Sequence, residues 1–183
     1  MSLTSTASAA TGPADFMTAP LSHLIHHIVG THHVYLKSEL PLLERLATQT
    51  ISENGALASL RDVFLELKAE LESHLWKEEV VLFPLILTLE EAERAGSPPP
   101  PAHCGSVNNP IRVMNMEHAG ANEALERMRR LTGDYSLPEK AGDPQKQLYA
   151  ALLRLEADLH RHIYLEDDIL FPRAARLEAD LLR

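Results

Sequence analysis

Apolar side chains recur at steps of three and four residues along most of the chain, the spacing that gathers them on one face of a helix. Turn-forming or proline-rich stretches interrupt this pattern at Asn54-Gly55, over residues 95–108 and over residues 134–144. No stretch shows the sustained alternation of apolar and polar residues expected of a strand. We therefore predict an all-α fold, a four-helix bundle in which successive helices run up, down, up and down.

The predicted helices carry polar residues on otherwise apolar faces. In the second helix the face comprises Leu60, Phe64, Leu67, Leu71, His74, Glu78, Val81 and Leu85. In the third it comprises Ile111, Met114, His118, Ala121, Leu125 and Met128. In the fourth it comprises Leu148, Leu152, Leu155, Leu159, His162, Glu166 and Ile169. Because such a face packs into the bundle core, we expect its histidines and glutamates to be buried.

The first helix, from about Pro20 to Ser52, is apolar around much of its circumference. Its apolar rows include both His32 and His33, so the periodicity alone leaves open which of them faces the core. Pro41 lacks a backbone N–H and is expected to kink this helix, as Pro84 is expected to disturb the second.

One short motif occurs twice. Residues 74–84 and 162–172 share a His, a Glu four residues later, and Leu-Phe-Pro at the end. Four residues are about one helical turn, so each His and Glu point the same way. His33 and His118, in the preceding helices, are separated by 85 residues, nearly the 88 that separate the two motifs. This spacing predicts an internal duplication of a helical hairpin.

Length and composition limit the domain organisation and the class of protein. The chain has 183 residues and a formal net charge of −9, which argues against non-specific nucleic-acid binding. We expect a disordered arm over residues 1–19 and one bundle over residues 20–183. No apolar run approaches the about 20 residues of a membrane span, and the N-terminus does not read as a signal peptide. With a single cysteine, Cys104, the expected location is the cytoplasm.

The buried polar residues predict a metal site. An ionised carboxylate in a core is costly unless it is paired or bound to metal, and no Lys or Arg matches Glu78 and Glu166 in depth. A single histidine in a core is usually only hydrogen-bonded. Here the histidines and glutamates recur at equivalent positions of duplicated helices, which favours metal binding. The candidate ligands are His74, Glu78, His118, His162, Glu166 and one histidine of the first helix.

Four histidines and two glutamates suit two metal ions, each bound by two histidines and bridged by both carboxylates. A solvent-derived oxo or hydroxo group would complete the bridge. Iron fits this donor set best, with manganese or zinc as alternatives.

Other acidic residues are candidates to support the ligands. Glu70 and Asp158 each lie one turn before a motif histidine, and Glu117 precedes His118, so each is a candidate acceptor for an imidazole N–H. A solvated acidic face is an equally good interpretation. Asp167 is an alternative bridge to Glu166.

Four motifs resemble the hemerythrin-like (HHE cation-binding) domains, and most closely the di-iron domain of the repair of iron centres family. They are His33 eight residues before Pro41, His74-x-x-Lys-Glu78-Glu-x-x-Leu-Phe-Pro, Met116-Glu117-His118-x-x-Ala, and His162-x-x-x-Glu166-x-x-x-Leu-Phe-Pro-Arg. The resemblance covers about residues 20–175 and favours His33 over His32. Oxygen-carrying hemerythrins usually have another histidine where this chain has Asn122. In the last helix they use an aspartate five residues after the histidine, whereas this chain fits His162 with Glu166 four residues later. Both differences favour a site of the repair type over that of an oxygen carrier.

The resemblance implies a non-haem di-iron protein that helps to restore damaged iron–sulfur centres under nitrosative or oxidative stress. It implies O2 or NO as a ligand of the irons, and iron–sulfur proteins as partners. Members of the repair family usually carry an N-terminal Cys-Cys pair, which this sequence lacks, so a complete repair role would need a partner. The alternatives are a carrier or sensor of O2 or NO, and a di-iron oxidase or peroxidase. Whether the protein is an enzyme, and its oligomeric state, stay open.

Overall fold

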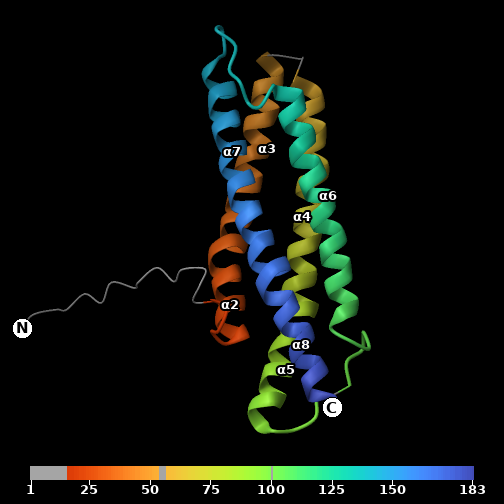
Figure 1. Cartoon of the computed structure of the whole chain (residues 1–183). Helices are drawn as coiled ribbons and strands as arrows, with labels where there is room; N and C mark the ends of the chain where they lie inside the picture. The colour runs from red at the N-terminus through yellow and green to blue at the C-terminus, as the bar shows by residue number, and fades with distance from the viewer. Residues whose placement is uncertain (1–15, 54–56, 100) are drawn as a thin grey trace, which may run out of the picture.

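The computed structural model describes residues 16–53, 57–99 and 101–183, and these residues form the predicted all-α bundle (Figure 1). The first and second rods of the bundle are α2 (Leu21–Ile28), η1 (Val29–His33) and α3 (Val34–Glu53), then α4 (Ala58–Lys77), η3 (Glu78–Leu82) and α5 (Phe83–Ala95). The third and fourth are α6 (Asn108–Thr132), then α7 (Asp143–Tyr164), η4 (Leu165–Leu170) and α8 (Phe171–Leu181). No helix among the described residues is both long and apolar enough to cross a membrane.

Successive rods run in opposite directions, which confirms the predicted up-down-up-down order (Figure 1). α3 packs against α4 and α7, and α4 packs against α6. Gly96 and Gly133 end α5 and α6 with φ of 61° and 56°. Because a side chain is strained in this left-handed conformation, glycine is the residue best suited to stop a helix there.

The apolar core divides into two clusters along the bundle axis. One lies among α3, α4, α6 and α7 and includes Leu67 and Leu155. The other joins α2, α5 and α8 to the start of α6 and includes Ile86 and Leu170. The histidines and glutamates predicted to bind metal fall at the junction of these clusters in all four rods. The fold therefore places the polar residues at mid-height, with apolar packing on either side.

Three of the four rods widen into a π-helical turn close to these polar residues. Phe83 N–H donates to the Glu78 carbonyl, Phe171 N–H to the Glu166 carbonyl, and Val34 N–H to the Val29 carbonyl, each across five residues. In η3 and η4 the next residue but one is a proline, Pro84 or Pro172, which has no N–H for the usual bond to the residue four before. The expected disturbance near Pro84 is thus a π turn, a feature that often marks functional sites.

The π turns change which residues face the core. Val81 and Leu85 were expected on the buried face of the second helix, but Val81 is 42% exposed while Leu82 and Ile86 are fully buried. The extra residue of η3 rotates the following helix by about 100°, so that the apolar face moves forward by one position. In η1 the same effect buries both His32 and His33, which explains why periodicity did not separate them.

The predicted disordered arm over residues 1–19 lies, up to residue 15, outside the described residues. Residues 16–19 pack on the bundle, and Phe16 is completely buried against α2 and its neighbours. Arg173 of α8 donates hydrogen bonds of 2.5 Å to the carbonyl oxygens of Phe16 and Ala19. The described packing therefore begins four residues before the expected start of the bundle.

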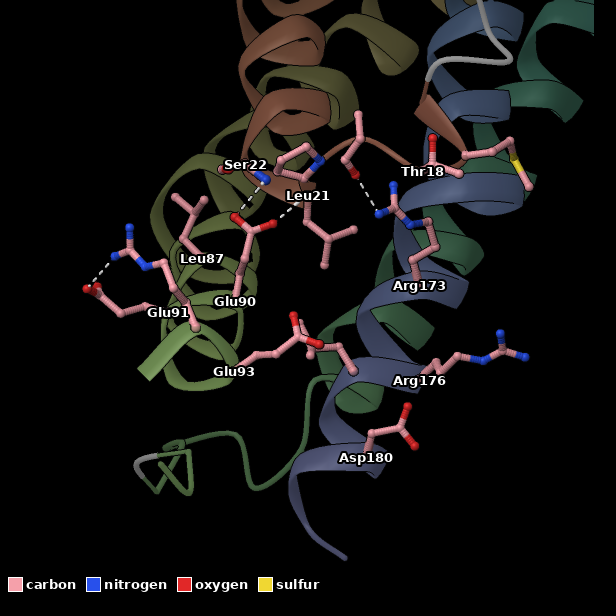
Figure 2. Close-up of a pocket in the computed structure, with 15 residues that line it drawn as sticks. Thr18, Leu21, Ser22, Leu87, Glu90, Glu91, Glu93, Arg173, Arg176 and Asp180 are labelled. Atoms are coloured by element: carbon pink, nitrogen blue, oxygen red, sulfur yellow. Dashed lines mark hydrogen bonds and ion pairs between the residues drawn. The ribbon is translucent and has the colours of Figure 1, made fainter. Parts of the chain in front are cut away.

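Glu90 of α5 caps the N-terminus of α2 (Figure 2). Its two carboxylate oxygens accept hydrogen bonds from Leu21 N–H at 2.5 Å and Ser22 N–H at 3.1 Å. These are N–H groups that a helix cannot satisfy with its own carbonyls. The carboxylate thereby fixes the first helix to the second rod.

We expect Glu90→Ala to lower the free energy of unfolding by about 1 kcal/mol, because two helix-terminal N–H groups lose their acceptor. Chemical denaturation of the two proteins measures this difference. Glu91→Ala is the matched control, because Glu91 is exposed and pairs only with Arg94 of its own helix. Equal effects of the two substitutions would contradict the capping role.

Candidate metal centre

The structure brings together all six residues predicted as ligands. They form two groups of four, and the candidate ligand atoms of each group lie within 4.8 Å of one another. One group is His33, Glu78, His162 and Glu166, and the other is His74, Glu78, His118 and Glu166. Both glutamates belong to both groups, so the arrangement has the shape of two adjacent positions that share their carboxylates.

The imidazole Nε2 atoms converge on these carboxylates. Glu78 Oε2 lies 3.3 Å from His33 Nε2 and 3.4 Å from His74 Nε2, so it faces one histidine of each group. Glu166 does the same, with Oε2 3.2 Å from His118 Nε2 and Oε1 2.9 Å from His162 Nε2. Each carboxylate therefore spans the two positions, as a bridge would.

The two glutamates are buried, and several polar atoms of the cluster lack a hydrogen-bond partner within the described part of the chain. Glu78 and Glu166 are completely buried. Both oxygens of Glu78, Oε2 of Glu166 and Nε2 of His33 have no hydrogen-bond partner. Buried polar atoms without a partner are costly, and a cation bound by both carboxylates and the imidazoles would satisfy all of them. The buried cluster therefore fits a two-metal site.

Three of the four imidazoles are oriented by carboxylates outside the cluster. Nδ1–H donates to Glu79 Oε1 from His33 at 2.7 Å, to Glu117 Oε2 from His74 at 2.9 Å, and to Asp167 Oδ1 from His118 at 2.7 Å. Lysines hold two of these acceptors, since Lys37 Nζ donates to Glu79 at 2.6 Å and Lys77 Nζ pairs with Glu117. A proton fixed on Nδ1 leaves Nε2 free to coordinate.

The acceptors differ in part from those expected. Glu117 is an acceptor, but for His74 rather than for its neighbour His118. Asp167 supports His118 and is not a member of either group. Glu70 is exposed and forms no hydrogen bond with His74, and Asp158 pairs with His32.

Glu79 was not predicted from the sequence. A signal was present, because Glu79 and Asp167 each directly follow the glutamate of a motif copy. Each supports the histidine of the preceding rod, His33 or His118.

The electrostatic environment differs among the site residues. Burial, reinforced by His162, lowers the pKa of His33 to about 4, and burial lowers that of His74 to about 4 as well. Burial also acts to lower the pKa of His118, but its hydrogen bond with Asp167 and its close contact with the Glu166 carboxylate raise it to about 9.

The two glutamates shift in opposite directions. Burial and the charge of Glu166 raise the pKa of Glu78 well above its usual range. Burial also acts to raise the pKa of Glu166, but His162 and His118 hold it below its usual range. Without metal, His118 therefore holds a proton at neutral pH, and the ionised form of Glu78 is disfavoured.

His32 is buried beside the cluster without belonging to it. Its side chain is 4% exposed, and its Nδ1 lies 2.8 Å from Asp158 Oδ1. Its ring stacks on that of His162, with centroids 5.4 Å apart and planes at 2°. The preference for His33 as the first-helix ligand stays a prediction, and the geometry agrees with it because only His33 belongs to a group of four.

Two cavities differ in their relation to the cluster. A small, mostly apolar cavity of about 20 Å³ is bounded by His74, His118 and His162 and by apolar side chains such as Leu71 and Leu159. A larger, open depression of about 890 Å³ lies between the start of α2, α5 and α8, and Figure 2 shows its charged lining. None of the six candidate ligands lines this larger depression.

A duplicated four-helix bundle with two histidine pairs and two shared glutamates defines a class of cation-binding domain. The sequence profile of the hemerythrin HHE cation-binding domain matches residues 24–174. The chain belongs to this family, which confirms the resemblance inferred from the motifs.

The chain is also similar to curated proteins that share one name. The iron-sulfur cluster repair protein YtfE of Edwardsiella ictaluri (strain 93-146) is 36% identical over 164 residues, which cover 87% of this chain and 68% of that protein. The YtfE of Yersinia pseudotuberculosis serotype IB (strain PB1/+) is 33% identical over 168 residues, covering 90% and 70%. The YtfE of Citrobacter koseri is 34% identical over 164 residues, covering 87% and 69%.

We expect Glu78→Leu to raise the free energy of unfolding of the metal-free protein by about 1 kcal/mol, because it replaces an unsatisfied buried carboxyl group with an apolar side chain. Denaturation in the presence of a chelator measures this. The matched substitution, Glu79→Leu, should be destabilising, because His33 and Lys37 lose their acceptor. Destabilisation of the metal-free protein by Glu78→Leu would show that the carboxyl group is satisfied without metal.

Proposed function

We propose that this chain is a cytoplasmic non-haem di-iron protein that takes part in the repair of iron–sulfur clusters under nitrosative or oxidative stress. The observation that supports this most directly is the pair of four-residue groups that share two buried, unsatisfied glutamates. The named function of the curated relatives supports the repair role.

In this proposal, His33 and His162 hold one iron, His74 and His118 hold the other, and Glu78 and Glu166 contact both. Nitrogen and carboxylate ligands suit iron in two oxidation states, with manganese and zinc as less favoured alternatives. Bound iron would supply redox chemistry and binding of small ligands. The chain contributes a site shielded from bulk water, and carboxylates that fix the imidazole rings.

The small apolar cavity supports a diatomic ligand, O2 or NO. Its volume of about 20 Å³ suits a molecule about the size of water, and three candidate ligand imidazoles form part of its wall. Glu70 and Glu117 also line the cavity, but apolar atoms provide most of its accessible wall, which favours a weakly polar guest. The proposed partners of the protein itself are iron–sulfur proteins carrying damaged clusters.

The freshly purified protein should contain two iron ions per chain, as measured by elemental analysis. Glu78→Ala or Glu166→Ala should lose most of the iron, because each removes a ligand from both positions. His33→Ala should bind fewer than two ions, whereas His32→Ala, outside both groups, should keep two. Two ions retained in both glutamate variants would refute the shared ligation.

Metal binding should release protons at neutral pH. His118, with a pKa of about 9, holds a proton in the metal-free protein and must lose it to coordinate, and the raised pKa of Glu78 acts in the same direction. Affinity should therefore rise with pH up to about 9, roughly tenfold per unit for each proton released. Calorimetric titration in buffers of different ionisation enthalpy counts these protons. A pH-independent affinity between pH 6.5 and 9 would contradict the assigned protonation.

The repair role is tested with an iron–sulfur enzyme inactivated by NO. Di-iron protein should restore its activity, and protein carrying Glu166→Ala should not. A stable, reversible O2 adduct without restoration would point to a carrier, and catalytic turnover of O2 or peroxide would point to an oxidase or peroxidase.

A further inference from the structure

The two proposed metal positions differ in how their imidazoles are held. At the position of His74 and His118, both rings donate Nδ1–H to carboxylates, Glu117 at 2.9 Å and Asp167 at 2.7 Å. At the position of His33 and His162, only His33 does so, to Glu79. Among the described residues, no carboxylate forms a hydrogen bond with Nδ1 of His162. One position therefore has two supporting carboxylates, and the other has one.

His32 and Asp158 account for this difference. Asp158 lies one helical turn before His162 on α7, a spacing at which two side chains of a helix can meet. Its Oδ1 is instead engaged by His32 Nδ1 at 2.8 Å, and its buried Oδ2 has no partner. His32 also stacks face to face on His162. His162 thus packs against a fifth imidazole, and its neighbouring carboxylate is held by that same ring.

The physical consequence concerns metal affinity. A carboxylate that accepts the second N–H of a ligating imidazole makes the ring a better donor to the metal, and removal of such a partner typically costs about 10–100-fold in affinity. Stacking on His32 restrains the plane of the His162 ring but supplies no acceptor. The position of His33 and His162 therefore has the weaker set of ligands.

We propose that the two irons are held unequally, and that the iron at His33 and His162 is the exchangeable one. This rests on the proposed function and deepens it, because it assigns to one position the iron that leaves more readily. When that ion leaves, the other keeps both shared glutamates together with His74 and His118. The buried carboxylates then stay compensated by the iron that remains.

The test is the release of ferrous iron from the full-length, anaerobically loaded protein to an excess of a chromogenic ferrous chelator. Release should occur in two phases of one iron each, with rates that differ by about 10–100-fold. His33→Ala should retain only the slow phase, and His118→Ala only the fast phase. Release of both irons in a single phase, or the opposite assignment of the phases, would overturn the proposal.

A second set of variants tests the cause and does not depend on the single-position variants binding iron. Asp167→Asn removes a supporting carboxylate from the tighter position and should accelerate the slow phase about 10–100-fold. His32→Phe keeps an aromatic ring against His162 but frees Asp158, and it should slow the fast phase. Asp168→Asn, which alters an exposed neighbour of Asp167, is the matched control and should change neither rate. An unchanged slow phase in Asp167→Asn would overturn the proposal.

The failure of this inference is distinct from failure of the proposed function. Two irons released at one rate would leave a di-iron protein with equivalent positions. A chain that binds no iron at all would overturn both.

Discussion

The burial of two carboxylates in an apolar core is the constraint on which the rest of this structure depends. Glu78 and Glu166 are completely buried, and three of their four oxygens have no hydrogen-bond partner among the described residues. The leucine-rich apolar clusters on either side of them contribute the free energy of folding that offsets the cost of burying the carboxylates. The bundle thus encloses a pair of buried carboxylates that fits a two-metal site.

Around this centre, successive layers of interaction reach the surface. Imidazoles surround the two glutamates, carboxylates hold three of the imidazoles, and Lys37 and Lys77 hold two of the carboxylates. Each layer orients the one inside it through these hydrogen bonds and ion pairs. The ring of His162 is the exception, since another imidazole, His32, takes the place of a carboxylate.

Helical period and the repeated motif were sufficient to predict the helices, their order and five of the six residues that converge, whereas His33 was favoured over His32 only by the resemblance to a known family. They were not sufficient where partners come from another rod. Glu79 supports His33 from 46 residues away, and no periodicity encodes that contact. The π turns were missed for a different reason, since a one-residue shift of phase leaves Val81 and Leu82 equally apolar as candidates for the core.

The π turns also carry information about the ancestry of the chain. η3 and η4 begin at, or one residue before, the motif glutamate and end two residues before the proline, in both copies of the motif. A π turn arises from one residue added to an α-helix. The simplest history places that insertion in a single ancestral hairpin, before the hairpin was duplicated. α6 has no such turn where the first rod has η1. The difference in local backbone, a π turn at His33 and none at His118, would then be younger than the duplication. The asymmetry between the two halves of the site would be younger than the duplication as well.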